Sequence, residues 1–201
     1  MAIDNKVKFG LSNFHVAPIT STTEAGVPTY GTPIKVPGSV SISLSKEVAK
    51  SIFYADNGAY YSLRNNRGYT GSYELAKVLA VILETIFGQK RSDEGILVEN
   101  QNDSFLECAI MFEIDGDVKP TRYCLPRVAL EKPDINATTV GENKEVQTES
   151  LDLTIMPRLD NGDISYRADA DTQTETYNNF YQSVPTPTYT QPQAQNEPEE
   201  E

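Results

Sequence analysis

The sequence predicts a mainly β fold of the α+β class, a β-sandwich or barrel with one flanking α-helix. Apolar and polar residues alternate with a period of two in several segments, whereas only one long segment has helical periodicity. Turn-forming residues separate the alternating segments, and strands do not alternate regularly with helices along the chain. The 201 residues suffice for one domain with tails.

The strand candidates share one pattern. Val40, Ile42 and Leu44 alternate with serines, which is typical of a strand with one face in water. The Asp-Gly pair at 115–116 and the Asn-Gly pair at 161–162 lie between strand candidates and predict two hairpins. Further strands are predicted over residues 14–19, 69–78, 105–114, 122–130 and 150–156.

Helical periodicity is clear in residues 75–87, where a helix is expected to begin near Lys77 or Val78, after a strand. Gly88 is its predicted C-cap. A second, short helix is predicted over residues 176–184. The apolar residues on one face are Leu79, Ile82, Leu83, Ile86 and Phe87 in the first helix, and Tyr177, Phe180, Tyr181 and Val184 in the second.

The folded domain is expected to span residues 1–184, with flexible segments attached to it. Residues 185–201 form an acidic tail rich in Pro, Thr, Gln and Glu, which cannot bury enough apolar surface to fold. Residues 45–68 mix charged and aromatic side chains, and we expect a long flexible loop with a functional role there. Residues 2–11 are expected to form a flexible N-terminal arm.

The chain is acidic, with 17 basic and 29 acidic residues and a net charge of −12. Such a chain cannot attract nucleic acid by releasing counterions from phosphates. It can instead line a channel to which DNA must not adhere, or the charge can simply keep the protein soluble. The N-terminus lacks an apolar signal core, and no stretch has the length of a membrane span, so a cytosolic product is expected.

Residue patterns for catalysis or cofactor binding are weak. The single histidine, His15, lies in a strand pattern without an evident partner. Residues 26–31 have the glycine spacing of a phosphate loop, but Thr32-Pro33 follows where Lys-Ser or Lys-Thr is required. Cys108 and Cys124 are too few for a zinc site or a disulfide framework, and Cys108 fits a buried, reduced thiol. The sequence therefore predicts a protein that is not an enzyme and binds no cofactor or metal.

Aromatic residues are concentrated in the polar segment 45–68. Phe53, Tyr54, Tyr60 and Tyr61 lie there outside any periodic strand. Aromatic side chains in such segments either await a partner surface or fold back onto their own sheet. Both interpretations remain open at the level of the sequence.

Short motifs spread from Lys6 to Val184 carry further information. They are residues 6–13 (KVKFGLSN), 30–33 (YGTP), 36–38 (VPG), 43–45 (SLS), 53–57 (FYADN) with Tyr60-Tyr61, 68–71 (GYTG), 95–100 (GILVEN), 112–117 (FEIDGD), 121–123 (TRY), 147–151 (QTESL) and 176–180 (TYNNF). As an ordered set they resemble the major tail proteins of long-tailed phages of Gram-positive hosts. Two features depart from that pattern: residues 79–87 are more apolar, and the acidic tail has no counterpart.

The resemblance implies a tail-tube fold, in which a β-sandwich with a flanking helix closes into six-membered rings. Stacked rings would form a tube through which phage DNA passes without specific binding. The resemblance also implies a location in the virion tail, after synthesis in the host cytoplasm. The implied partners are further copies of the chain, the tape-measure protein, tail chaperones, and the terminator and tip proteins.

Contacts between subunits are expected from three features: paired edge strands, the N-terminal arm and the segment 45–68, the last two becoming ordered on assembly. The alternative function is a β-sandwich binding or decoration module that recognises the capsid or a host-surface carbohydrate. The absence of tryptophan, a common sugar-stacking residue, counts mildly against it. The candidate contact residues are Lys6, Phe9, Leu11, Phe53, Tyr54, Tyr60, Tyr61, Arg64 and Arg67.

Overall fold

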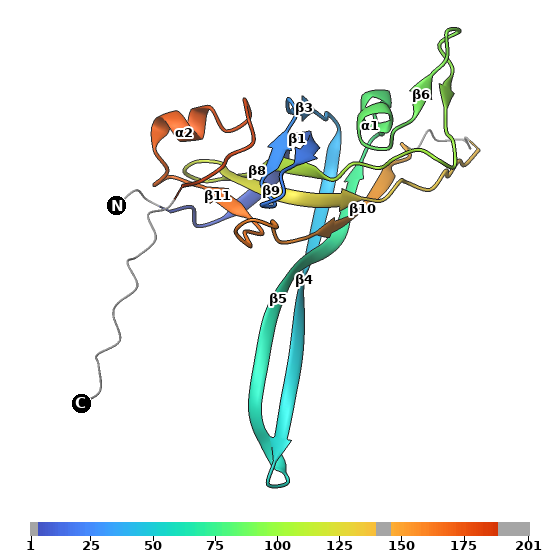
Figure 1. Ribbon diagram of the computed structural model, residues 1–201. Helices are drawn as coiled ribbons and strands as arrows, with labels where there is room; N and C mark the ends of the chain where they lie inside the picture. The colour runs from blue at the N-terminus through green and yellow to red at the C-terminus, as the bar shows by residue number, and fades with distance from the viewer. Residues whose placement is uncertain (1–3, 140–145, 189–201) are drawn as a thin grey trace.

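The computed structural model describes residues 4–139 and 146–188 (Figure 1). Strands dominate and the helices are short, so the predicted mainly β fold with a flanking helix is confirmed. In chain order the elements are β1 (Lys8–Thr22), β2 (Pro28–Tyr30), β3 (Ile34–Lys35), β4 (Ser39–Ala55), β5 (Gly58–Leu75), α1 (Ala80–Thr85), β6 (Lys90–Arg91), β7 (Leu97–Val98), β8 (Cys108–Gly116), β9 (Thr121–Leu130), β10 (Glu149–Ile155), β11 (Tyr166–Ala168) and α2 (Thr174–Asn178).

One antiparallel sheet contains most of the strands, in the order β2-β1-β8-β9-β10-β5-β4. β3 also pairs with β1, β11 pairs with β9, and β6 and β7 form a separate hairpin. The sheet curls so that the segment just before β4 reaches β1. There, the Val36 N–H donates a hydrogen bond to the carbonyl of Phe14 in β1 at 2.8 Å. The Phe14 ring also stacks on Tyr73 of β5, with ring centroids 3.8 Å apart. The sheet thus wraps around its own core.

The sheet is covered on both faces, as the residues of β8 show. Alternate side chains of a strand point to opposite faces, and Ile110 and Phe112 join one core whereas Ala109 and Met111 join another. The larger core lies under α1 and the turn that follows it. The smaller core lies under α2 and residues 179–184. The covering residues are Ile82, Ile86 and Phe87 over the larger core and Tyr177, Phe180 and Val184 over the smaller one.

Two sequence predictions about local structure are corrected. The first helix is only Ala80–Thr85, shorter than predicted, because the backbone is still extended at Leu79, its N-cap, and the helix ends at its C-cap, Ile86. Gly88 has a φ of 71° in the turn that follows. A Cβ atom on Gly88 would lie 2.7 Å from the carbonyl oxygen of Ser104, so the turn requires glycine. The Asn161-Gly162 turn does not close a hairpin, since the strand after it, β11, pairs with β9 and not with β10. The hairpin predicted from Asp115-Gly116 is confirmed, because β8 pairs with β9, but Asp115 and Gly116 are the last residues of β8 and the turn lies at residues 117–120.

Residues 45–68 are not the flexible loop that the sequence predicts. They form most of a long β4–β5 hairpin, which Figure 1 shows projecting far from the body of the protein. Its tip is a two-residue turn with Asp56 at φ 50° and Asn57 at φ 60°. Positive φ at both central residues is the geometry that matches the twist of a hairpin, and Asp and Asn tolerate it.

The two chain ends differ from each other. β1 begins at Lys8, and Asn5 is already bound to the β8–β9 turn, so the prediction of a flexible N-terminal arm is wrong for residues 5–11. Residues 2 and 3 lie outside the described residues. The predicted disordered tail, 185–201, is described only as far as residue 188, and the rest of it also lies outside.

Candidate subunit interface

The projecting hairpin is exposed along most of its length. β10 pairs with β5 only between Tyr69 and Leu75, so below that point β4 and β5 pair only with each other. We call this part, residues 47–68, the arm. At about 3.3 Å per residue its ten or so residue pairs extend roughly 30 Å from the sheet. Both outer edges of the arm therefore present unpaired backbone N–H and C=O groups.

Cross-strand partners divide the arm into two faces. Phe53 lies opposite Tyr61, and Ser51 lies opposite Leu63, so these side chains share one face. On the other face Lys50 lies opposite Arg64. Like charges opposite each other destabilise a hairpin. The first face therefore carries two aromatic rings and Leu63 beside Ser51, and the second carries two positive charges side by side.

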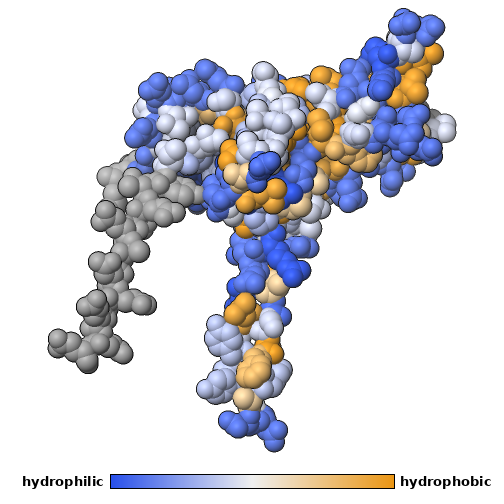
Figure 2. Space-filling view, in the orientation of Figure 1, coloured by the Kyte–Doolittle hydropathy of each residue, from blue (hydrophilic) through white to orange (hydrophobic). Residues whose placement is uncertain are grey.

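The aromatic side chains of the arm are exposed to solvent. The exposed fraction is 74% for Tyr60, 67% for Tyr54, 62% for Phe53 and 59% for Tyr61. Figure 2 shows hydrophobic surface along the arm, with hydrophilic surface at its tip and near its base. A two-stranded hairpin is at best marginally stable in water, and large exposed apolar patches are typical of interaction sites. These side chains do not fold back onto the sheet, which resolves the alternative left open by the sequence.

The remaining arm candidates are the two arginines. Arg64 and Arg67 are both exposed on β5, Arg64 in the middle of the arm and Arg67 near its base. None of the ion pairs formed among the described residues involves an arm residue. The structure thus brings six of the nine sequence candidates, from Phe53 to Arg67, together on one projecting element.

The three N-terminal candidates lie elsewhere and differ in exposure. Lys6 is held by its backbone N–H, which donates to Asp117 Oδ1 at 2.7 Å. Phe9 is 68% exposed on β1, whereas Leu11 is half-buried and packs against the larger core. Leu11 is therefore better explained by folding than by assembly. The arm and the N-terminal segment do not form one continuous site.

Asn5, which the sequence analysis did not select, fixes the N-terminal segment. Its side-chain oxygen accepts hydrogen bonds from the backbone N–H groups of Val118 and Lys119, at 2.9 and 3.0 Å. Its amide nitrogen donates to the carbonyl of Lys119 and to Thr121 Oγ1, at 2.5 and 3.2 Å. These bonds satisfy the backbone of the β8–β9 turn, so this end of the molecule is formed before any partner binds.

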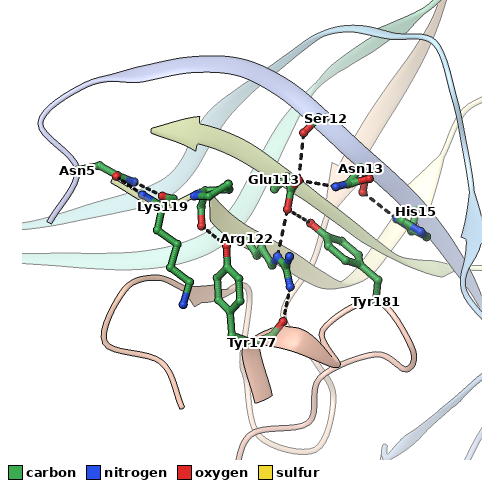
Figure 3. Close-up of polar contacts among 10 residues, drawn as sticks. Asn5, Ser12, Asn13, His15, Glu113, Lys119, Arg122, Tyr177 and Tyr181 are labelled. Atoms are coloured by element: carbon green, nitrogen blue, oxygen red, sulfur yellow. Dashed lines mark hydrogen bonds and ion pairs between the residues drawn. The ribbon is translucent and has the colours of Figure 1, made fainter. Parts of the chain in front are cut away.

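A polar cluster around Glu113 fastens the C-terminal segment to the sheet (Figure 3). Glu113, on β8, is only 6% exposed and forms an ion pair with Arg122 of β9 at 3.1 Å. Its carboxylate also accepts hydrogen bonds from Ser12, Asn13 and the Tyr181 hydroxyl. Arg122 in turn donates to the carbonyl of Tyr177. The cluster therefore holds α2 and the residues after it against the smaller core.

Aromatic stacking completes this cluster. The Arg122 guanidinium lies 3.9 Å from the ring centroid of Tyr177 and 4.9 Å from that of Tyr181. His15 stacks on Tyr181 with centroids 4.6 Å apart. Burial lowers the pKa of His15, although a hydrogen bond to the carbonyl of Asn13 opposes the shift. Burial also disfavours the charged form of Tyr181, and because this form is the phenolate, burial raises the pKa of Tyr181. A structural role for His15 fits these contacts.

Possible metal, thiol and cavity sites were the remaining candidates for a functional site. Within residues 4–139 and 146–188, no three or more His, Cys, Asp or Glu side chains are grouped so that they could hold a metal ion. Cys108 and Cys124 are both fully buried, and burial raises the pKa of each thiol. An open cavity of about 560 Å³ beside the N-terminal segment is lined by residues that include Lys6, Lys8 and Arg167. No helix in the described part of the chain is long and apolar enough to cross a membrane.

Comparison with known proteins gives structural neighbours only. The sequence matches no protein-family profile and no characterised protein. One similar structure is a chain from the cryo-EM structure of the anti-feeding prophage baseplate, 6-fold symmetrised, with 12% identity and a TM-score of 0.45 over 80% of this chain and 95% of that one. Another is from the anti-feeding prophage cap, described as a tube-terminating cap, with 14% identity and a TM-score of 0.39 over 84% and 97%. The resemblance to major tail proteins therefore rests on the short sequence motifs.

Proposed function

We propose that this chain is a structural subunit of a phage tail, the major tail tube protein, and that identical copies assemble into stacked six-membered rings around a hollow conduit for DNA. The observation that carries the proposal is the arm, a two-stranded hairpin that exposes four aromatic side chains and two open edges. A two-stranded hairpin of this kind is only marginally stable in water by itself, and a covering surface would stabilise it. The ordered tail-protein motifs of the sequence indicate which assembly supplies that surface.

Assembly would also complete the sheet within each ring. β4 is the outer strand at one side of the sheet, and the short strand β2 is the outer strand at the other. Open sheet edges are liable to pair with other chains unless they are covered. Pairing of the β4 edge of one subunit with the opposite side of its neighbour would join the sheets around the ring, and the net charge of −12 would disfavour adhesion of DNA to the conduit.

The proposed partners follow from a position in the tail tube. Further copies of the chain form the tube, the tape-measure protein occupies its interior during assembly, and terminator and tip proteins cover its ends. Tail chaperones act before assembly in the host cytoplasm. Phage DNA passes through the conduit without sequence-specific contacts.

The test is negative-stain electron microscopy of the concentrated, purified chain. The wild type is expected to form rings or hollow filaments. A variant in which residues 49–65 are replaced by Asn-Gly keeps the sheet but lacks most of the arm, and it is expected to form no filaments. Its thermal unfolding should match the wild type, because the removed residues make up a projecting hairpin outside the two cores.

The result separates the alternatives. A small soluble oligomer that forms no rings or filaments at any concentration, and that binds a capsid or carbohydrate surface, would contradict the tube and support a binding module. Normal filaments from the arm-shortened variant would contradict the role of the arm in stacking.

A further inference from the structure

The cavity beside the N-terminal segment lies on the face of the sheet opposite to α2. Its volume is about 560 Å³, and residues 4–8, the start of β9 and the end of β11 surround it. Tyr123 of β9 pairs directly with Arg167 of β11, so both side chains point to this face. The neighbouring Ala168 points to the other face, into the smaller core. A cavity of this size is large enough to hold a short peptide segment.

Three cations line this cavity, and two of them have no ion pair. Lys6 and Lys8 are both exposed, and neither takes part in an ion pair with any residue that the structure describes. Arg167, the third cation, donates to Asp169 at 2.9 Å. Asp4 is the other carboxylate of the lining. The lining thus has one positive charge in excess, on a chain whose net charge is −12, and two ammonium groups are available to an anionic ligand.

The acidic tail, residues 185–201, is a segment of this chain whose charge matches the cavity. It contains no lysine or arginine, and all its charged side chains are glutamates. Ammonium groups and carboxylates form charge-assisted hydrogen bonds, which are stronger than neutral ones. The glutamates are Glu197, Glu199, Glu200 and Glu201.

The tail begins close enough to the cavity to reach it. Val184 packs in the same smaller core as Ala168, whose neighbour Arg167 lines the cavity. Figure 1 shows the described chain beginning and ending on the same side of the molecule. Glu197 can lie up to roughly 30 Å from Thr188, at about 3.3 Å per residue. Passing from one face of a sheet to the other takes only about 10 Å.

We infer that the acidic tail docks in this cavity of the same chain, with its glutamates facing Lys6 and Lys8. Lys50 and Arg64 on the arm are the competing cations, but they lie on an exposed hairpin face. The cavity instead lets a docked segment contact residues 4–8, β9 and β11 at once. Docking by exposed charges weakens as salt is added. The inference goes beyond the proposed function and does not depend on it, since it concerns one subunit by itself.

Engineered cysteines in the full-length chain measure docking in dilute solution. Val7→Cys lies in the cavity lining, and Pro198→Cys lies among the glutamates of the tail. The matched control replaces Val7→Cys with Val48→Cys on the arm, because the two valines are 48% and 47% exposed. The natural cysteines are fully buried and do not compete. Non-reducing electrophoresis and mass spectrometry then give the fraction of chains closed by an internal disulfide in a glutathione buffer.

The cavity lysines should decide how readily the disulfide closes. At low salt the Val7→Cys, Pro198→Cys chain is expected to close about tenfold more readily than the same chain with Lys6→Gln and Lys8→Gln, since two exposed ion pairs together contribute about this factor. Salt of about 1 M, where charges are screened within about 3 Å, should remove the difference.

The arm provides the controls for this measurement. The chain with Val48→Cys and Pro198→Cys should close no more readily than the chain without the cavity lysines. Lys50→Gln with Arg64→Gln should leave closure of the Val7→Cys, Pro198→Cys chain unchanged. Both cavity lysines are exposed, so their glutamine variants should unfold at the wild-type temperature, which circular dichroism would verify.

Two results would overturn the inference. One is equal closure at low salt with and without the cavity lysines. The other is disulfide-linked dimers in place of closed monomers, which would assign the tail to the cavity of a second copy. Filament formation is measured separately, so either result would leave the proposed tube untouched, and a wild type that forms no filaments would leave the tail assignment untouched.

Discussion

At the residue scale, the smaller core depends on one buried ion pair. The side chains of Glu113 and Arg122 are only 8% and 16% exposed, and both are surrounded by hydrogen-bond partners. Removing one member of a buried pair leaves the other charged and unpaired, which costs far more than the pair contributes when intact. Glu113 also joins β1, β8, β9 and the segment after α2, so its loss affects all four.

We therefore predict that Glu113→Ala lowers the free energy of unfolding by about 3–5 kcal/mol. Chemical denaturation monitored by circular dichroism measures this change. The control is Glu84→Gln, which breaks the Glu84–Arg91 pair, whose side chains are 36% and 46% exposed. An exposed pair is worth about 1 kcal/mol or less, so a similar loss in both variants would contradict the role assigned to Glu113.

At the scale of elements, the arm depends on close approach of β4 and β5 where they leave the sheet. A Cβ atom on Gly71 would lie 1.9 Å from the carbonyl oxygen of Ser43 on β4. A backbone oxygen cannot move aside as the end of a side chain can, so the two strands would have to separate. Near the tip of the same hairpin, a Cβ on Gly58 would meet its nearest atom, the carbonyl oxygen of Ala55, only at 3.9 Å.

Gly71→Ala is expected to destabilise the protein by about 1–3 kcal/mol, as overpacking does. Gly58→Ala should change stability far less, because the added methyl group makes only ordinary van der Waals contact. Thermal and chemical unfolding of the two variants give the comparison. Equal stabilities would show that the β4–β5 spacing at Gly71 adjusts without cost.

At the scale of the whole molecule, the arm leaves the sheet on one side and the β6–β7 hairpin projects on the other (Figure 1). Growth by head-to-tail contacts has no built-in end. A chain that lacks the arm but keeps the rest of its surface should join a growing stack and stop it. The arm-shortened variant, with residues 49–65 replaced by Asn-Gly, is such a chain.

We predict that adding the arm-shortened variant to wild-type chains shortens the filaments progressively as its share of the mixture rises. Electron microscopy of filament lengths measures the effect. The control is Val118→Ser, which changes a side chain that is 50% exposed in the β8–β9 turn and should leave the lengths unchanged. Unchanged lengths with the arm-shortened chain, despite its normal folding, would mean that stacking does not pass through the arm.

The sequence by itself determined the mainly β class and the strands with a buried face, such as residues 122–130 and 150–156, which the structure places in β9 and β10. Alternation reports burial of one face, so it identifies strands that lie on a core. The Asp-Gly pair at 115–116 also indicated the β8–β9 hairpin, although both residues end β8 and the turn itself follows them.

Only the tertiary structure established that residues 45–68 pair as an arm, that β11 pairs with β9, and that Glu113 is the centre of a polar cluster. Residues 45–68 pair as strands without a buried face, so their alternation carries no burial signal, and the sequence indicated only their exposed aromatic residues. Glu113 stands out as a charge in the apolar run of β8, but its partners come from β1, β9 and the segment after α2. Contacts between distant segments depend on how the sheet curls, which no local pattern specifies.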